Sequence, residues 1–526
     1  MKLSVILVCV FILKLHETDG SSISSCPSYG CRPSGTFSVL LKLPSLQPKV
    51  IWNTTYGPIP NCLGCVGNIN NIICPYQGLR LNGYVSIDGQ TGKQVWYDGV
   101  LHHPSLPVMD IQGDIIGTDG RNLVKYEADG TQVKPSIPIN PSLYPLYSVQ
   151  LSDNGFLLFA SKAGIIFAYD TVGIPLGAIS LNGSIQMVNG TFIPVTTPII
   201  VGSRVYVLTE FKADYVDPME HNILGMRRLY AVDIFARMAD RLHITWVFDF
   251  EMELKSRMGK TNRSVPNGHT FSFDANQKQS SVNTGFENVL KFKPHLHIVE
   301  GEPLIMADSQ RQNIYVILPA PENDVDSGRM FWAIKDNGDN QTLLYKQSIS
   351  ASRMAMYEVN GSLKKQPIKP HNYKKSRKSP LMEKIVKKQN IHDEKDDGIP
   401  VWLLSQSKNL IYKVLPMNGS IAVTLNLTSM FGGQVDVTSD IMICREDDNQ
   451  ADSIIFGVSV KKSSTQNFLV SISESGNIQW MVATPSNAAV IGQIAGISDE
   501  GSNSDNMFVA FGTAEESHLS VVFGVQ

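Results

Sequence analysis

The feature that most constrains the fold is a short motif that returns along the whole chain. At residues 84–96 the sequence reads Tyr-Val-Ser-Ile-Asp-Gly-Gln-Thr-Gly-Lys-Gln-Val-Trp. Two runs of strand-forming residues flank a turn, in which Asp88 and Thr91 can hydrogen-bond the backbone and Gly92 can take a positive φ. The motif therefore predicts a β-hairpin.

Fainter copies of this hairpin recur to the end of the chain, at residues 122–133, 165–173, 229–246, 331–338, 410–419 and 469–480. Short apolar runs precede several of them, such as 197–201 with 205–208, and suit inner strands that are buried on both faces. Self-similarity at a period of a few tens of residues is typical of a propeller. We therefore expect a ring of four-stranded antiparallel blades.

The two ends of the chain complete this ring. Residues 490–494, 507–511 and 519–523 read as three strands without a fourth, and residues 49–53 read as a lone outer strand. Pairing them makes an eighth blade and removes exposed sheet edges. The sequence thus predicts an all-β, eight-bladed β-propeller closed by its N- and C-terminal strands. Seven blades is the alternative, because the inner strands of the first blade, 62–67 and 71–76, are irregular.

Tryptophans occupy equivalent places on the predicted outer strands, at Trp52, Trp96, Trp246 and Trp480. Such a stripe is compatible with a carbohydrate platform. At a fixed repeat position, however, packing between neighbouring blades is the simpler role, and we predict it here.

The N-terminus has the features of a secretory signal over residues 1–20. Lys2 precedes an apolar core at residues 3–13, and small residues follow at Gly20 and Ser21. The core is shorter than the roughly 20 residues that span a bilayer, and no later segment is apolar for long enough. We predict a secreted protein, with the endoplasmic-reticulum lumen as the alternative, although the C-terminus lacks a retention signal. Residues 21–48 then form a cysteine-containing segment, and residues 49–526 the propeller.

Sequons and cysteines fit this compartment. The candidate glycosylation sites are Asn53, Asn182, Asn189, Asn262, Asn340, Asn360, Asn418 and Asn426. The candidate disulfide cysteines are Cys26, Cys31, Cys62, Cys65, Cys74 and Cys444. Their pairing stays open, and Cys62-Leu-Gly-Cys65 could instead be a zinc half-site or a redox pair.

A basic insertion interrupts the repeats at residues 361–399. Between 364 and 388 it holds ten Lys and Arg residues against one acid, with three prolines, so we predict a solvated loop. Lys374, Lys375, Arg377 and Lys378 are candidate contacts for an acidic polysaccharide. Proteolytic processing and the lack of any dedicated partner are the alternatives. The net charge of −3 gives no overall attraction to nucleic acid, so we predict no nucleic-acid partner.

Motifs for catalysis and metal binding are missing from the sequence. It has no nucleophile elbow, phosphate-binding loop or His-Glu-x-x-His zinc motif. Acidic turns, such as 336–339 and 446–448, lack the spacing of a calcium loop, so we expect ordinary solvated turns. On a strand, His295 and His297 would share one face, but the sequence offers no third ligand nearby. No catalytic residue and no metal site is predicted.

The hairpin pattern, Tyr/Leu-x-x-(Leu/Ile/Val)-Asp-x-x-Thr-Gly-x-x-x-Trp, resembles the repeat of the quinoprotein-alcohol-dehydrogenase-like propellers, also called pyrroloquinoline-quinone (PQQ)-like repeats. The resemblance covers nearly all of the chain after residue 49 and implies the propeller fold. Family members include calcium- and quinone-dependent dehydrogenases, outer-membrane assembly scaffolds and luminal sensor domains. The enzymes carry adjacent cysteines over the cofactor and an aspartate base beside calcium. No position here matches these, so no catalytic residue is transferred.

Together these features predict a non-enzymatic scaffold, without a cofactor, that binds an extracellular protein or glycan. The alternative is a PQQ- and calcium-dependent dehydrogenase with its site in the central funnel. A luminal scaffold of the secretory pathway is the third reading.

Overall fold

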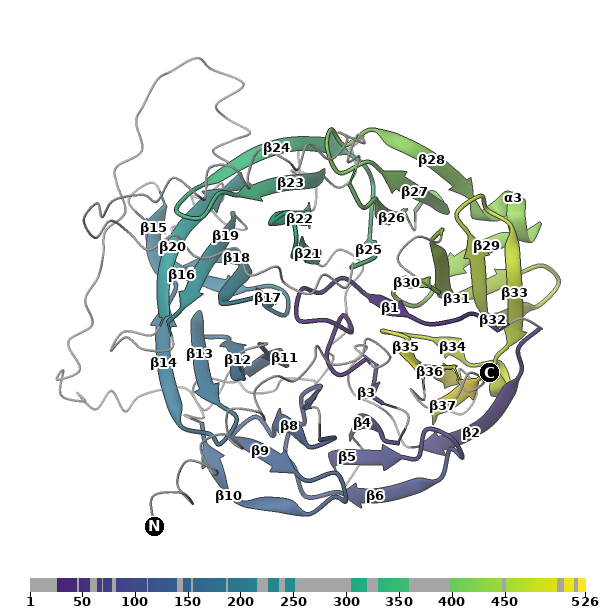
Figure 1. The fold of residues 1–526 in the computed structure, drawn as a ribbon, viewed down its shortest axis with the longest axis horizontal. Coiled ribbons are helices and arrows are strands. Elements are labelled where there is room, and N and C mark those ends of the chain that lie inside the picture. The colour runs from purple at the N-terminus through teal and green to yellow at the C-terminus, as the bar shows by residue number, and fades with distance from the viewer. Residues whose placement is uncertain are drawn as a thin grey trace, which may run out of the picture.

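The computed structural model describes residues 26–526, except for 45–46, 57–63, 69, 78–81, 111, 140–144, 153–154, 186–187, 215–225, 236–241, 251–303, 319–329, 359–397, 406, 447–450, 499–505 and 515–518. Its strands form eight sheets arranged as a ring (Figure 1). Each sheet is one blade, numbered here in chain order. The prediction of an eight-bladed β-propeller is therefore confirmed.

Within each blade, the strands are named in order from the centre of the ring outward. Blade 1 has β3 (Val66–Gly67), β4 (Ile72–Gln77), β5 (Asn82–Ile87) and β6 (Gln94–Asp98). Blade 2 has β7 (Val108–Met109), β8 (Ile115–Thr118), β9 (Asn122–Tyr126) and β10 (Gln132–Pro138). Blade 3 has β11 (Pro145–Leu151), β12 (Phe156–Ser161), β13 (Ile165–Asp170) and β14 (Pro175–Ser180). Blade 4 has β17 (Ile199–Val201), β18 (Arg204–Ala213), β19 (Arg227–Ile234) and β20 (Leu242–Asp249).

The second half of the ring repeats this layout. Blade 5 has β21 (Leu304–Asp308), β22 (Asn313–Leu318), β23 (Met330–Asp336) and β24 (Gln341–Ser348). Blade 6 has β25 (Arg353–Met356), β26 (Val401–Ser405), β27 (Leu410–Val414) and β28 (Ile421–Asn426). Blade 7 has β30 (Met442–Arg445), β31 (Ser453–Lys461), β32 (Thr465–Ser473) and β33 (Ile478–Ala483). Blade 8 has β34 (Ala489–Val490), β35 (Ala495–Ile497), β36 (Met507–Ala514), β37 (Leu519–Val525) and β2 (Val50–Tyr56).

Some elements are additions to the four-stranded pattern. The hairpin of β15 (Asn182–Ile185) and β16 (Val188–Pro194) extends blade 4, and β29 (Gln434–Val437) pairs with β31. A short helix, α3 (Leu427–Phe431), and a 3₁₀ turn, Pro485–Asn487, lie in connections. The strand β1 (Ser38–Leu40) runs parallel to β30 on the channel side. None of these was predicted from the repeat.

The ring is closed by the two ends of the chain, as the sequence predicted. The N-terminal strand β2 pairs antiparallel with the C-terminal β37, from Val50 opposite Val525 to Tyr56 opposite Ser520. The hairpin predicted at residues 84–96 is also confirmed, because β5 pairs antiparallel with β6. In its turn, Oδ1 of Asp88 accepts the backbone N–H of Thr91 at 2.7 Å. Gly92 in the same turn has a φ of +69°.

The core lies between blades, where the faces of neighbouring sheets pack together. One apolar cluster joins blades 7, 8 and 1 and includes Ile455, Phe508 and Val85. Burying such side chains contributes roughly 1.5–3 kcal/mol each, which holds each blade against the next.

The four outer-strand tryptophans lie at these seams, which confirms their predicted packing role. Trp52 of blade 8 donates Nε1–H to the carbonyl of Gly89 in the blade 1 turn, at 2.7 Å. Trp96 of blade 1 makes the same bond to Ala128 of blade 2, at 3.1 Å. The ring of Trp480 lies 5.8 Å from that of Phe508 in blade 8, measured between centroids.

Candidate functional site

The central channel holds the chain's own N-terminal segment, residues 26–41, which we call the plug. Figure 1 shows this segment and β1, in purple, in the middle of the ring. Its backbone hydrogen-bonds the inner strands of six blades. These bonds join Cys26 to Gly67, Pro27 to Met109, Pro33 to Ile200, Ser34 to Ala307, Thr36 to Met356, and Phe37 to Ile443, at 2.7–3.1 Å. The plug thus bridges blades that are far apart in sequence.

Local sequence explains how the plug turns inside the channel. A disulfide between Cys26 and Cys31 closes its first loop. Gly35 has a φ of +70°, and a Cβ placed there would lie 2.9 Å from the Ile199 side chain and 3.2 Å from the carbonyl oxygen of Ile305. Only glycine fits this approach to blades 4 and 5 without displacing a neighbour.

Two polar side chains of the channel wall hold the plug. Gln493, which is 1% exposed, accepts the N–H of Gly30 with Oε1 at 2.8 Å and donates from Nε2 to the carbonyl of Cys65 at 2.7 Å. Glu358 accepts the hydroxyls of Ser34 and Thr36 at 2.5 and 3.2 Å. The amide and the carboxylate are therefore engaged by the chain itself.

The plug is buried along most of its length. Ser34, Thr36, Ser38 and Val39 are each at most 3% exposed. Residues of the plug therefore occupy space near the axis of the ring.

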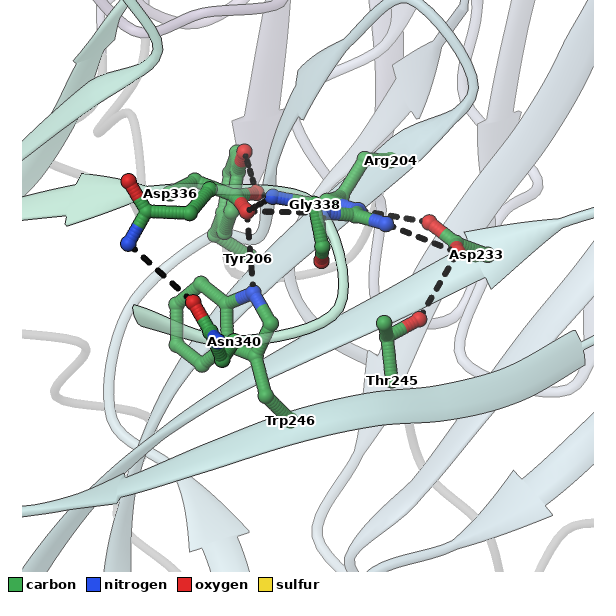
Figure 2. Close-up of polar contacts among 9 residues, drawn as sticks. Arg204, Tyr206, Asp233, Thr245, Trp246, Asp336, Gly338 and Asn340 are labelled. Carbon is green, nitrogen blue, oxygen red and sulfur yellow. Dashed lines mark hydrogen bonds and ion pairs between the residues drawn. The ribbon is translucent and has the colours of Figure 1, made fainter. Parts of the chain in front are cut away.

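A second polar network joins blade 4 to blade 5 (Figure 2). Arg204 of β18 donates from Nη1 to both carboxylate oxygens of Asp336, at 2.8 and 2.7 Å. The same guanidinium holds Asp233 of β19 through Nε and Nη2, at 2.6 and 2.8 Å. The hydroxyl of Tyr206, Nε1–H of Trp246 and the backbone N–H of Gly338 also donate to Asp336, at 2.7, 3.1 and 2.8 Å.

The charges in this network account for its pKa shifts. Burial opposes the charge on Arg204, but the Asp233 and Asp336 carboxylates outweigh it and raise the pKa of Arg204 above its ordinary value. Burial raises the pKa of Tyr206, and the Asp336 carboxylate adds to that rise. Because four donor groups already contact Asp336, the network acts as a structural link between blades.

Asp336 corrects one prediction. Its turn was expected to be an ordinary solvated one, but Asp336 is 1% exposed. The reason is Arg204, which lies 132 positions earlier in the chain and reaches the turn only in the closed ring. Among the described residues, no group of three His, Cys, Asp or Glu side chains is arranged to hold a metal ion.

The predicted disulfide cysteines behave in three ways. Besides Cys26–Cys31, a disulfide joins Cys65 to Cys74, so Cys65 is not the partner of Cys62 in a redox pair. Cys62 itself lies outside the described residues. Cys444 is a buried thiol rather than a disulfide cysteine, with its Sγ 3.1 Å from the carbonyl oxygen of Leu41 in the plug. Burial raises the pKa of Cys444 to about 12, so this thiol is unreactive at neutral pH.

The other predicted site residues are only partly placed. The sequon asparagines that the structure describes are all exposed, namely Asn53, Asn182, Asn189, Asn340, Asn418 and Asn426. Asn262 and Asn360 lie outside the described residues, as do Lys374, Lys375, Arg377 and Lys378 of the basic insertion. No helix among the described segments is long and apolar enough to cross a membrane.

The plug and the Arg204–Asp336 link were missed by the sequence reasoning. The available signal for the plug was the glycine- and cysteine-containing stretch 26–35 ahead of the first repeat. Nothing local in the sequence pairs Arg204 with Asp336, because the two residues belong to different blades.

Comparisons with known proteins find only remote similarities, all to solved structures. No family model matches the chain, and no curated protein matches it. Among solved structures, BamB from Moraxella catarrhalis is similar at 11% identity and a TM-score of 0.43, over 90% of this chain and 99% of that one. Quinohemoprotein alcohol dehydrogenase from Comamonas testosteroni is similar at 10% identity and a TM-score of 0.39, over 95% and 73%. The dihydro-heme d1 dehydrogenase NirN is similar at 8% identity and a TM-score of 0.43, over 92% and 81%.

These similarities are too remote to assign an activity. The propeller architecture rests on the strand pairing itself, and the resemblance to the PQQ-like family stays a prediction.

Proposed function

We propose that this protein is a secreted glycoprotein propeller that acts as a binding scaffold rather than an enzyme. The observation that carries the proposal is the plug, which occupies the channel where the alternative places a catalytic site. A closed ring is rigid, while the connections at its two ends can vary and recognise partners.

The residues of the channel do not fit a quinone and calcium site. Plug residues lie near the axis, and the wall groups Gln493 and Glu358 are bonded to the plug. The Asp336 carboxylate lies at a seam, where Arg204, Tyr206 and Trp246 donate to it. A cofactor would have to displace the plug before reaching the channel wall.

Secretion is supported by the chemistry of the cysteines and the sequons. The Cys26–Cys31 and Cys65–Cys74 disulfides suit an oxidising compartment, where such bonds persist. The exposed positions of the described sequon asparagines suit glycosylation. Mass spectrometry of the secreted protein, before and after glycosidase treatment, tests both features.

The enzyme alternative is tested by titrating the purified protein with pyrroloquinoline quinone, with and without calcium. We expect no saturable change in tryptophan fluorescence and no dye-linked alcohol oxidation. Calcium-dependent saturation with turnover would overturn the scaffold proposal.

The basic insertion is a second proposed contact, for an acidic polysaccharide. Its test is retention on a heparin column after Lys374, Lys375, Arg377 and Lys378 are changed to alanine. We expect retention to fall sharply. Unchanged retention would remove these four residues from the interface.

A further inference from the structure

The added hairpin of β15 and β16 carries two of the candidate glycosylation sites. Asn182-Gly-Ser184 lies on β15, and Asn189-Gly-Thr191 lies on β16. Figure 1 shows β15 at the periphery of the ring. This strand ends the sheet of blade 4, where it pairs with β16. Among the described strands, no other pairs with β15, so one of its edges is open.

The two sequons interlock across this hairpin. Asn182 lies opposite Thr191, and Oγ1 of Thr191 donates to Oδ1 of Asn182 at 3.1 Å. Ser184 lies opposite Asn189 in the same way. Each pair therefore joins the asparagine of one sequon to the hydroxyl residue of the other. Because side chains alternate between the two faces of a strand, all four side chains lie on one face.

The opposite face of the hairpin packs against the propeller. Gly183 lies opposite Gly190, and a Cβ at Gly183 would lie 3.2 Å from Cε2 of Phe192 and 3.5 Å from Nη1 of Arg228. A Cβ at Gly190 would overlap the carbonyl oxygen of Lys212. The ring of Phe192 is fully buried, and the Arg228 guanidinium lies 4.2 Å from its centroid. The face with the sequons is therefore the one that meets solvent, and both asparagines are exposed.

The open edge lacks the usual protection against pairing. Residues 171–203 contain no Asp, Glu, Lys, Arg or His, which is the longest such run in the sequence. The charge that continues the sequon face is Lys212 of β18, opposite Thr191, and β16 separates it from β15. Open edges pair with other chains unless charges, prolines, bulges or a covering group prevent it. Because β15 holds neither a charge nor a proline, a covering group is the remaining protection.

N-linked glycans can supply this cover without disturbing the hairpin. In the transfer, Nδ2 of asparagine bonds to the anomeric carbon of a polyprenyl-diphosphate-linked oligosaccharide. The diphosphate leaves with the electron pair of its bond, and the amide nitrogen gives one proton to a base of the transferase. Oδ1 is not consumed, so Asn182 can still accept from Thr191. The attached glycan is bulky and strongly solvated.

We propose that Asn182 and Asn189 carry N-linked glycans that cover the outward face of this hairpin and prevent β15 from pairing with β15 of a second copy. A second strand would have to lie beside β15, within reach of the glycan on Asn182. This inference rests on the proposed secreted glycoprotein and gives a role to two of its sites.

The test uses the full chain, secreted from a glycosylating host. Mass spectrometry of peptides measures the occupancy of each sequon, and size-exclusion chromatography with light scattering measures the mass over a concentration series. We expect a monomeric wild type with both sites occupied. We expect dimers or larger oligomers from Asn182→Gln with Asn189→Gln. Ser184→Ala with Thr191→Ala removes the same glycans but keeps both asparagines, and should give the same oligomers.

Asn340→Gln with Asn418→Gln is the matched control. It removes two glycans from the turns of blades 5 and 6, away from any open edge of this hairpin, and should stay monomeric. Adding Ser184→Lys to the Asn182 and Asn189 variant places a charge on the open edge, which should restore the monomer. A loss of secretion in that variant is read in the same way, and Ser184→Lys should restore the yield.

Three results would overturn the proposal. The first is a variant without these two glycans that stays as monomeric as the control. The second is association, or loss of secretion, that Ser184→Lys does not relieve, because the open edge is then not its cause. The third is an unmodified Asn182 and Asn189 in a protein whose other sequons are occupied. This last result leaves the secreted glycoprotein standing, whereas a protein without any glycan contradicts that proposal as well.

Discussion

Single side chains at the seams decide how one blade meets the next. The indole of Trp52 donates to the hairpin turn of the following blade, and Trp246 reaches the corresponding turn through Asp336. The acceptor is a backbone carbonyl for Trp52 and the side-chain carboxylate of Asp336 for Trp246. Asp336 can serve as this acceptor because Arg204 of blade 4 pairs with its charge and holds it in the buried seam. A repeat position can therefore keep its packing role while its hydrogen-bond chemistry changes.

Removing the Asp336 carboxylate should destabilise the protein. In Asp336→Ala, Arg204 keeps Asp233 as a carboxylate partner but loses Asp336, and the hydroxyl of Tyr206 loses its acceptor. We expect the free energy of unfolding to fall by about 3 kcal/mol, as measured by urea denaturation. Asp339→Ala, at an exposed residue of the same turn, should change it by less than about 0.5 kcal/mol. Equal effects would mean that the Arg204 network contributes nothing to stability.

At the scale of elements, the plug has little regular structure of its own, and its backbone hydrogen-bonds the inner strands of the blades instead. Only its last part, β1, forms a strand of its own, parallel to β30. The remaining residues make single hydrogen bonds to successive inner strands, so each bond depends on the placement of a different blade.

Gly35 provides a test of how closely the plug is fitted. Gly35→Ala and Gly155→Ala both place alanine at a positive φ, which costs about 1 kcal/mol. No atom lies within 4 Å of the Cβ position at Gly155, whereas Gly35 faces blades 4 and 5. We therefore expect Gly35→Ala to lose a further ~1–3 kcal/mol in thermal unfolding, together with faster proteolysis within residues 26–41. A plug that is cleaved no faster than in Gly155→Ala would contradict the fitted channel.

At the scale of the whole molecule, the N-terminal region closes the ring twice. The plug bridges inner strands, and β2 supplies the outer strand of blade 8. Both are made before the other described strands, whereas β37 follows them all, so closure waits until β37 has been made.

Deleting residues 26–56 should open the ring. The outer edge of β37, with Val521, Val522 and Phe523, then loses its partner, and exposed edges pair with other chains. We expect oligomers or aggregates by size-exclusion chromatography, and recovery of monomer when an oxidised peptide of residues 26–56 is added. The Gly35→Ala variant, which keeps β2, should stay monomeric. A monomeric deletion variant with an unchanged circular dichroism spectrum would show that closure does not require these strands.

The sequence by itself determined the blades, their number and the closing strands. These follow from local rules, because turn residues such as Asp88 and Gly92 bond within one hairpin, and strand alternation is readable over a few residues. The position of Trp52 or Trp96 was predictable for the same reason, since a repeated residue meets a repeated neighbour. Only the tertiary structure decided the path of the plug and the burial of Asp336. In each case the partners come from different blades, and no local pattern records a contact that exists only after the ring has closed.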